Sequence, residues 1–465
     1  MKKYFFFRII RSIVSIFLVT TLTYALIYSL VPRRTIFQDD PNITKLKSDP
    51  DKLEDYQNTA FSKMDYIDYH NSKSLLEIVK KEYPKVTAEP TEANKEIYEK
   101  WAKENPGWKI GQFEISKGFY ATKELNLAQR VGRFYSNLIH IDHPWKIKDP
   151  DNPDLKRSIK IENDSEVGWS LVGSGTQHKY LIYFNSSFPF IHQNIVTFNL
   201  GVSYPTYAQV PVLDVISQRQ GKTKSTEVTF EDGTTKKTSA NIYSREYTMT
   251  ANLSASAKKQ YQDNYTTTET IHQDPSMVGT SFIMGSLGVL IAYLVAIPMS
   301  VLMARFKGKL VDKVGIAIVT VLISVPSLAF IYFFRFIGNG LFKLPTMFPT
   351  LGAGNVKSYI LPTIILGFLS VPGLVIWIRR YMIDQQSADY VKFAKAKGLS
   401  AGEISRRHIF KNAIIPIANG IPGSIIGAIS GATITETIFA APGMGKMLPE
   451  AIKDHNNPIV IGLVL

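Results

Sequence analysis

Five long apolar stretches constrain this chain of 465 residues more than any other feature of its sequence. A bilayer core of about 30 Å requires roughly 20 consecutive apolar residues in a helix. The stretches that meet this requirement cover residues 12–31, 277–303, 314–334, 359–378 and 414–434. A further apolar run, residues 458–465, stops with the chain, and we interpret it as a truncated sixth helix. The sequence therefore predicts a multi-pass helical membrane protein, with helix kinks at Pro326 and Pro372.

The first stretch has two possible roles. Lys2, Lys3, Arg8 and Arg11 precede it, as in a cleaved signal peptide. Its apolar run is longer than a typical signal peptide core, however, and Val31-Pro32-Arg33 lacks the small residues of a cleavage site. The sequence favours an uncleaved signal anchor, so that residues 1–34 form a cytoplasmic end and a first transmembrane helix.

The distribution of charge separates a large polar block from the apolar parts. Residues 35–275 carry 30 Lys and Arg against 32 Asp and Glu, whereas the rest of the chain carries 23 against 7. A soluble nucleic-acid-binding protein would carry the basic excess on its polar domain, so we expect no nucleic-acid partner. The chain has no cysteine, which excludes disulfides and thiol nucleophiles. No catalytic arrangement, metal-ligand cluster or cofactor motif stands out.

Lys and Arg in short loops predict the orientation in the membrane. With the N-terminus inside, the inner segments carry 16 basic residues and the short outer segments carry 7. We therefore expect a plasma-membrane protein whose N-terminus is cytoplasmic and whose residues 35–275 are extracellular. Membrane lipid would surround residues 276–465.

The extracellular block is predicted to be an α+β domain inserted after the first span. Its first part shows helical periodicity over residues 73–83, 91–104 and 127–138. Its second part contains β-branched and aromatic runs at residues 180–184 and 195–198. Residues 227–238 predict a hairpin that turns at Asp232-Gly233.

The loop between the fourth and fifth spans, residues 381–413, contains the clearest local signals of secondary structure. A helix ending at Lys397 places Gly398 where a positive φ is needed, and Ser400-Ala-Gly-Glu403 predicts a capping box for a second helix. Such a projecting helix suits docking into the groove of a cytoplasmic partner. Its basic residues are equally suited to lying on anionic lipid. On physical grounds alone, docking onto a protein partner and lying on anionic lipid are both possible roles for this loop.

Three motifs, one of them in this loop and two elsewhere in the chain, resemble those of a known family. Tyr390-Val-Lys-Phe-Ala-Lys-Ala-Lys-Gly398 is similar to the "EAA" loop of ABC-importer permeases, most of all in the dipeptide/oligopeptide branch. Glu436-Thr-Ile-Phe-Ala-Ala-Pro-Gly-Met-Gly-Lys446 resembles the segment that follows the fifth span in that family, and Asn199-Leu-Gly-Val-Ser-Tyr204 resembles its "DLG-S" stretch. The resemblance extends to the Ami-type permeases of Gram-positive bacteria, which carry a similar insertion after the first span.

Two features depart from the common family pattern. Lys392-Phe393 stands where the EAA loop usually begins with Glu, so no acidic residue is assigned there. The extracellular block is also much longer than in the usual peptide permease, and the shared motifs do not reveal its role. We consider a cap that contacts the peptide-binding protein, or a rigid spacer through the cell wall.

The resemblance implies a transmembrane subunit of an ATP-driven oligopeptide importer that forms half of the translocation path. It implies coupling to two cytoplasmic ATPases through Ala394, Ala396, Gly398, Leu399, Ser400 and Glu403. The other implied partners are a second homologous permease, an extracellular peptide-binding lipoprotein and an oligopeptide substrate. ATP and Mg would be bound by the ATPases, because Gly443-Met-Gly-Lys446 has Ala440 where a P-loop needs Gly. We therefore predict that this chain is not an enzyme.

Small residues and one carboxylate mark further candidate sites. Gly423, Gly427 and Gly431 recur at a four-residue spacing that brings helices close together, either within the chain or against a second permease. Glu436, with Pro442 and Gly443, is a candidate for the outer gate, although Glu436 could equally be an exposed salt-bridge partner.

Two other functions remain as alternatives. A membrane-anchored extracellular sensor or enzyme would need an active site in residues 35–275. A secondary transporter would need ionisable groups near the bilayer midplane, and the five spans are nearly free of charge.

Overall fold

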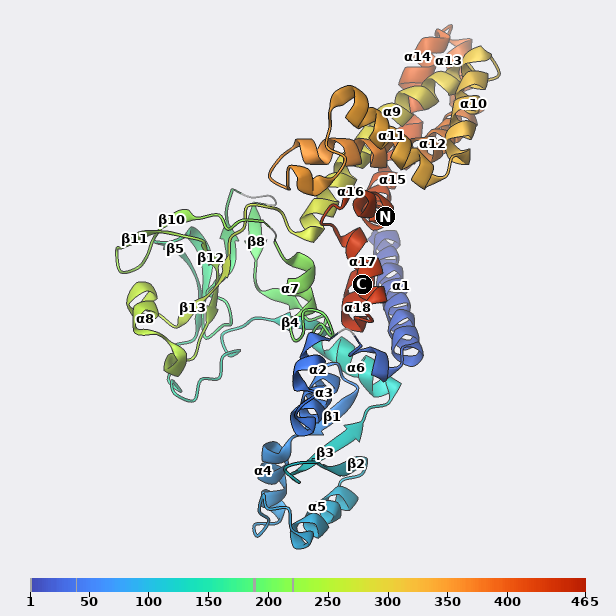
Figure 1. The fold of residues 1–465 in the computed structure, drawn as a ribbon. Coiled ribbons are helices and arrows are strands. Elements are labelled where there is room, and N and C mark those ends of the chain that lie inside the picture. The colour runs from blue at the N-terminus through green and yellow to red at the C-terminus, as the bar shows by residue number, and fades with distance from the viewer. Residues whose placement is uncertain (1, 39, 187–189, 220) are drawn as a thin grey trace. The chain divides into compact units, whose positions relative to one another are not determined.

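The computed structural model describes residues 2–38, 40–186, 190–219 and 221–465, which form two compact units (Figure 1). The first unit combines residues 1–216, 223–271 and 450–465, and the second combines residues 217–222 and 272–449. This division differs from the expected grouping of residues 276–465, because the last 16 residues pack with the polar block.

The first unit contains both helices and strands. Its helices are α1 Lys2–Leu30, η1 Arg33–Thr35, α2 Pro41–Leu46, α3 Pro50–Lys63, α4 Ser72–Glu82, α5 Glu92–Glu104, α6 Leu127–Leu138, α7 Val212–Ser217, η2 Thr250–Asn252, α8 Ala255–Tyr261 and α18 Asn457–Val464. Its strands are β1 Ile67–His70, β2 Trp108–Gln112, β3 Phe119–Glu124, β4 Ile139–Ile141, β5 Ser158–Asp164, β6 Gly168–Ser174, β7 Tyr180–Phe184, β8 Ile191–Gln193, β9 Val196–Phe198, β10 Thr226–Thr229, β11 Thr235–Thr238, β12 Ala240–Tyr247 and β13 Tyr265–Thr270.

The strands form small antiparallel sheets. The two larger sheets have the strand orders β1-β3-β2 and β5-β6-β7-β8, and the pairs are β4-β9, β10-β11 and β12-β13. The predicted hairpin is confirmed, with Gly233 at a φ of +77° and the Asp232 carboxylate accepting from the backbone N–H of Thr234. The three predicted helices correspond to α4, α5 and α6, and their boundaries agree with the sequence pattern to within a residue.

The first helix of the chain packs on α6 through aromatic rings. The guanidinium of Arg130 on α6 lies 4.1 Å from the ring centre of Tyr28 on α1 and 4.0 Å from that of Tyr66. Phe134 of α6 lies against Tyr24 of α1, with ring centres 5.4 Å apart. A buried cation held by aromatic faces retains much of the interaction that water would otherwise supply.

The "DLG-S" stretch holds the last helix of the chain. The side-chain amide of Asn456 donates to Ser203 Oγ at 2.7 Å and to Thr206 Oγ1 at 2.8 Å, and Asn456 also caps α18. Gly462 allows α18 to approach α7 closely, because a Cβ there would lie 2.7 Å from Val212 Cγ1. Asn456 is fully buried, so its hydrogen bonds cannot be replaced by solvent.

The second unit is helical. Its elements are α9 Met277–Arg305, α10 Leu310–Ser324, α11 Ser327–Phe342, η3 Phe348–Thr350, α12 Lys357–Gln386, α13 Asp389–Ala396, α14 Ala401–Glu403, the π-helix η4 Ile404–Ile409, α15 Phe410–Gly431, α16 Thr433–Phe439 and α17 Met444–Lys453. Among the described residues of the whole chain, four helices are long and apolar enough to cross a membrane, or five if the bent pair α10–α11 is one span.

The predicted third span is not one kinked helix. Its chain breaks at Val325-Pro326 into α10 and α11, whose axes differ by 105°. Proline lacks the N–H that would continue the hydrogen-bond ladder and disfavours a helical conformation in the residue before it. Val325 is accordingly extended, with φ −76° and ψ 126°. By contrast, α12 continues through both Pro362 and Pro372.

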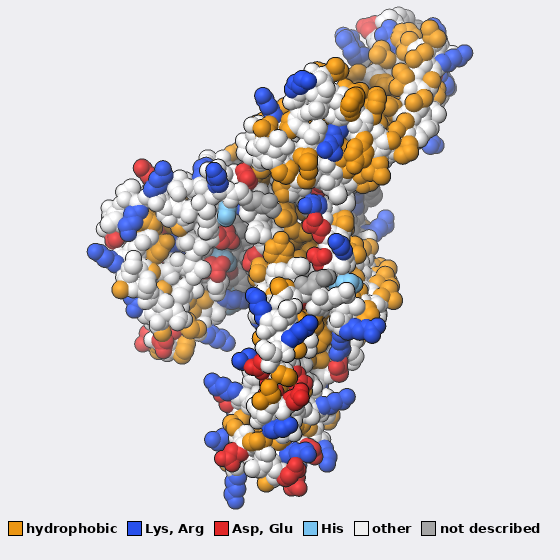
Figure 2. Space-filling view, viewed as in Figure 1, with side chains coloured by type: hydrophobic (Ala, Val, Ile, Leu, Met, Phe, Trp, Pro, Cys, Tyr) orange, Lys and Arg blue, Asp and Glu red, His pale blue; other side chains and the backbone are white. Residues whose placement is uncertain are grey.

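The largest core of the second unit joins α9 and α12 to the helices of the loop between α12 and α15. It contains Met303 of α9, Met382 of α12, Ala394 of α13 and Ile404 of η4, all of them buried. Figure 2 shows hydrophobic side chains gathered over the long helices of this unit, with Lys and Arg concentrated at the end that carries α13 and α14. The loop helices and the two long helices α9 and α12 therefore share one close-packed core.

Candidate coupling loop and outer-loop site

The turn after α13 has the geometry that the sequence predicts. Gly398 has a φ of +75°, its N–H donates to the carbonyl of Lys395, and the N–H of Leu399 donates to the carbonyl of Ala394. These two bonds, at 2.9 and 3.2 Å, define a Schellman motif at the end of the helix. Glycine is favoured here because a side chain is strained at this backbone conformation.

The cap of the next helix is only half of the predicted box. Ser400 Oγ accepts from the backbone N–H of Glu403 at 3.3 Å, as expected. The Glu403 carboxylate does not reach the backbone N–H of Ser400. It accepts from Ser400 Oγ at 3.3 Å instead and lies 3.7 Å from Arg407 Nη1. The prediction of a reciprocal capping box is therefore wrong, because Arg407 one turn later holds the carboxylate on the outer face of the helix.

The second loop helix runs into the fifth span without a break. The segments α14, η4 and α15 follow one another, and residues 401–429 form a single candidate span. Ile404 and Ile409 of the π-helical turn are buried in the same core as Val391 and Ala394 of α13. Single π-helical turns are frequent at functional sites because they change which side chains face the core.

The predicted coupling residues divide between the core and the surface. Ala394 is buried and Leu399 is partly buried, whereas Ala396, Gly398 and Ser400 are exposed. Sequence reasoning missed Phe393, whose side chain is 71% exposed between two lysines. An exposed aromatic residue on a short basic helix is an expected anchor for a partner surface. Its isolation between Lys392 and Lys395 was the available signal.

Two anchors hold the base of the loop. The guanidinium of Arg379 on α12 donates two hydrogen bonds of 2.7 Å to the Asp312 carboxylate on α10, which also accepts from the backbone N–H of Gly308. The side chain of Gln386 donates to the carbonyl of Ala304 at 2.7 Å. Bidentate pairs of this kind fix orientation as well as distance, so α12 and the loop after α9 are held together. Spacing in the sequence gives no signal for either contact.

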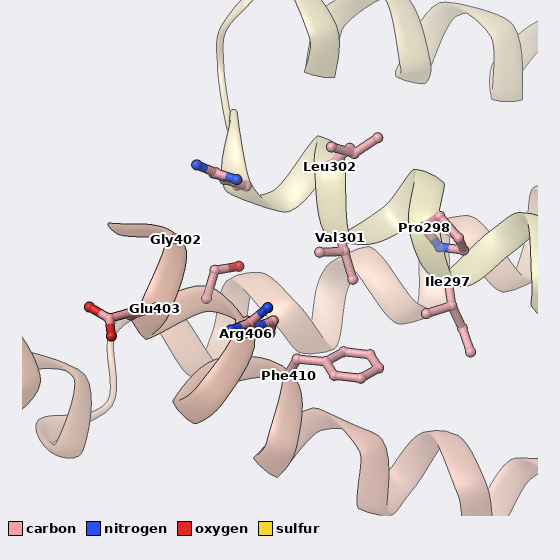
Figure 3. Close-up of a pocket in the computed structure, with 10 residues that line it drawn as sticks. Ile297, Pro298, Val301, Leu302, Gly402, Glu403, Arg406 and Phe410 are labelled. Carbon is pink, nitrogen blue, oxygen red and sulfur yellow. The ribbon is translucent and has the colours of Figure 1, made fainter. Parts of the chain in front are cut away.

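A pocket of about 600 Å³ lies beside the candidate coupling loop, residues 381–413 (Figure 3). The last two turns of α9 form one wall, where Ile297 and Val301 face the opposite helix. The other wall runs from Gly402 to Phe410 along α14, η4 and the start of α15. Arg305 and Arg406 add two cations to this mainly apolar lining.

The outer-gate candidates lie in direct contact with one another. Glu436 is in the separate helix α16, is fully buried, and accepts from Ser281 Oγ at 2.6 Å and from the backbone N–H of Lys446 at 3.1 Å. Ser281 Oγ in turn accepts from the N–H of Met444 at 2.8 Å. The alternative of an exposed salt-bridge partner is therefore wrong, because the loop that follows Pro442 covers the carboxylate.

Glycine allows this loop to cover the carboxylate. A Cβ at Gly443 would lie 2.3 Å from the Glu436 carboxylate, and a Cβ at Gly445 would lie 2.7 Å from the backbone N of Thr433. Pro442 is partly buried between Ala441, which is fully buried, and Gly443. The structure thus explains the spacing of the Glu436–Lys446 motif as a carboxylate wrapped by a glycine-containing loop.

Two glycines of the predicted stripe, Gly423 and Gly427, make no close packing contact with the described residues of this chain. A Cβ added at Gly423 or Gly427 would meet nothing within 4 Å, and both residues are exposed. The surroundings of Gly431 lie outside what the structure describes. Intrachain packing by Gly423 and Gly427 is therefore contradicted, whereas Gly420, one turn earlier, does pack on Trp377. A second cavity of about 500 Å³, lined by residues of α9, α11, α12, α15 and α16, opens beside Gly427.

Comparison with known proteins identifies the family to which this chain belongs. Residues 296–465 match the family described as binding-protein-dependent transport system inner membrane component. The chain is 54% identical to the oligopeptide transport system permease protein AmiC of Streptococcus pneumoniae over 468 aligned residues, which cover 100% of this chain and 93% of that protein. The chain therefore belongs to the oligopeptide permease family, the multi-pass membrane subunits of ABC importers.

More distant similarities are confined to part of the chain. The dipeptide transport system permease protein DppB of Lactococcus lactis is 28% identical over 202 residues, covering 43% of this chain and 65% of that protein. A chain of the MetNI methionine ABC transporter, solved in inward-facing conformations, matches 40% of this chain and 82% of its own length at 13% identity and a TM-score of 0.33. The alternatives of a sensor, an enzyme or a secondary transporter are not supported.

Proposed function

We propose that this chain forms one half of the translocation path of an ATP-driven oligopeptide importer. Cytoplasmic ATPases would dock on the exposed face of residues 393–400 and move it when they close around ATP. The observation that carries the proposal is the shared core, in which Ala394 and Ile404 of the loop pack with Met303 of α9 and Met382 of α12. ATP-driven closure would thereby bias the helix bundle between inward-open and outward-open states.

The partners follow from the same family membership. We propose a complex with a second homologous permease, two ATPase subunits and an extracellular peptide-binding lipoprotein. ATP and Mg would bind to the ATPases, and this chain would carry no cofactor. The exposed stripe at Gly423 and Gly427 supports a second permease, because small residues allow helix backbones from two chains to approach closely. The cavity beside Gly427 would then face the peptide route.

The polar block, residues 35–275, is proposed to lie outside the cell, with the N-terminus of the chain in the cytoplasm, as the Lys and Arg distribution predicts. One face of its four-stranded sheet supports docking of the peptide-binding lipoprotein. Cross-strand pairing places Ile161, Leu171 and Ile182 on one face together with Trp169, since paired residues share a face. Ile161 is 75% exposed and Trp169 is 64% exposed. Exposed apolar patches of this kind mark interaction sites.

Site-directed cross-linking tests the coupling assignment, and because this chain has no native cysteine, an introduced thiol is the single thiol that it contributes. In the intact importer, we expect Ala396→Cys to form a cross-link to an ATPase chain. The yield of this cross-link should change when ATP closes the two ATPase subunits around it. Lys357→Cys is the matched control, because Lys357 is equally exposed but lies at the opposite end of α12. An ATPase cross-link from Lys357→Cys, or none from Ala396→Cys, contradicts the proposal.

A further inference from the structure

The pocket beside the coupling loop is divided into an apolar part and a cationic part (Figure 3). Ile297, Pro298, Val301, Leu302 and Phe410 line the apolar part. Arg305 and Arg406 provide the cations, and Glu403 is the acidic residue of the lining. A ligand that matches this lining must carry a long apolar group and an anionic group.

Neither cation has a carboxylate partner in the described parts of the chain. Among the residues that the structure describes, Arg305 and Arg406 form no ion pair within 4.0 Å, whereas Arg379 and Arg407 each form one. The Glu403 carboxylate, which also lines the pocket, is held by Ser400 and Arg407. The guanidinium of Arg305 lies over Gly402, where a Cβ would be 3.5 Å from its Nη2. Two unpaired cations at the rim of an apolar pocket favour an anionic ligand.

The position of the pocket along the span selects the class of ligand. The candidate span α9 ends at Arg305, so Ile297 and Val301 lie within the last turns of the apolar helix and Arg305 lies at its boundary. This order, apolar inside and cationic at the boundary, matches a phospholipid, whose acyl chain precedes its phosphate along the bilayer normal. Basic pockets between transmembrane helices are known binding sites for anionic lipid headgroups.

We propose that this pocket binds one anionic phospholipid, with its phosphate between Arg305 and Arg406 and an acyl chain along Ile297, Val301 and Phe410. The lipid would lie in the inner leaflet, an assignment that rests on the proposed orientation, although binding itself does not. Because the pocket includes Gly402 and Ser405 on the continuous path from the coupling loop to α15, the bound lipid would stabilise one position of that path.

Lipid retention by the purified importer complex tests this proposal. Native mass spectrometry would count phosphatidylglycerol and phosphatidylcholine that remain bound to the complex after titration with each lipid. We expect one phosphatidylglycerol to be retained in preference to phosphatidylcholine. The double variant Arg305→Gln with Arg406→Gln should bind phosphatidylglycerol about 30-fold more weakly, because each basic residue near an anionic headgroup contributes about fivefold.

Two further variants separate this pocket from general electrostatics. Lys309→Gln with Arg380→Gln removes the same charge from exposed residues that do not line the pocket, and should leave retention unchanged. Gly402→Phe keeps both arginines but fills the pocket, and should also abolish retention. Equal retention of the two lipids by the wild-type complex, or unchanged retention in the arginine variant, overturns the proposal. The proposal would also be wrong if this pocket held a segment of the second permease in place of a lipid.

Discussion

Gly398, with its positive φ at the end of α13, allows a direct test of the proposed coupling role. Gly398→Val places a β-branched residue at a φ of +75°, at a cost of about 2 kcal/mol or more. We expect the importer to assemble but to lose peptide-stimulated ATP hydrolysis, because the exposed residues of the loop are displaced. Peptide-stimulated hydrolysis in proteoliposomes is the measurement.

The matched control for this variant is Gly352→Val. Gly352 has a φ of +76° and, like Gly398, no atom within 4 Å of an added Cβ, but it lies in the loop before α12. The control should carry the same strain and retain stimulation. Equal loss of stimulation in both variants would show that backbone strain alone, and not the position of the coupling loop, explains the result.

Glu436 makes a second prediction at the residue scale. Glu436→Gln leaves one acceptor oxygen for two donors, the N–H of Lys446 and the hydroxyl of Ser281, so that one of these donors loses its acceptor. A buried unsatisfied donor costs about 1–3 kcal/mol, so the loop over the carboxylate should open more often. Ala441→Cys reports this opening, because Ala441 is fully buried.

We expect Glu436→Gln to increase the rate of thiol labelling at Ala441→Cys at least about fivefold. Ala292→Cys is the control, since Ala292 is also fully buried but belongs to the core of α9 and α12. It should stay protected in both backgrounds. Labelling at Ala441→Cys that does not change would contradict the role assigned to the carboxylate.

At the scale of elements, one histidine joins three segments of the first unit. His178 Nδ1 lies 3.1 Å from Asp142 Oδ2, just after β4, and its Nε2 lies 3.5 Å from Glu246 Oε1 on β12. Burial alone lowers the pKa of His178, but the hydrogen bonds to the two carboxylates outweigh it and raise the pKa to about 9. The same contact lowers the pKa of Glu246.

The pKa of His178 predicts how stability depends on pH. Because the folded-state pKa is raised from 6.5, the stabilisation is fully present below pH 6.5 and is lost as the pH rises to about 9. The loss is on the order of 3 kcal/mol. The unfolding temperature of the first unit should fall over this interval, and His178→Gln should flatten the dependence.

Tryptophan fluorescence can follow this unfolding within the full protein. Trp101, Trp108, Trp145 and Trp169 belong to the first unit, and Trp377→Phe removes the fifth tryptophan, which belongs to the second. An unfolding temperature equally sensitive to pH in His178→Gln would assign the effect to other groups.

At the scale of the whole molecule, the exposed sheet face decides between a docking cap and a spacer. We expect Ile161→Ser with Trp169→Ser to lower the affinity of the importer for its peptide-binding lipoprotein at least about tenfold, equivalent to about 1.4 kcal/mol. Both side chains are mostly exposed, so the fold should be retained. The effect should depend weakly on salt, because the polar block has nearly equal numbers of acidic and basic residues.

The control for the sheet face lies on the same strand. Lys160→Ser with Glu162→Ser changes two exposed residues that alternate with Ile161 and therefore point to the opposite face. Binding of the lipoprotein should be unchanged in this variant. Unchanged affinity in both variants would favour the spacer.

The sequence by itself determined the elements whose signal is local. Apolar length located the spans, Asp232-Gly233 located a hairpin turn, and Gly398 located the end of a helix, because each depends on a few consecutive residues. Family motifs located the candidate coupling loop and the Glu436–Lys446 loop. These features depend on backbone preferences and on hydropathy, which a sequence states directly.

Only the tertiary structure decided which distant residues meet. It placed Glu436 beneath Gly443 and Gly445, paired Arg379 with Asp312, left Gly423 and Gly427 without intrachain neighbours, and broke the third span at Pro326. Contacts of this kind arise from packing between elements far apart in the sequence, and no periodicity encodes them. The pocket with Arg305 and Arg406 belongs to the same class, because its two walls are about 100 residues apart along the chain.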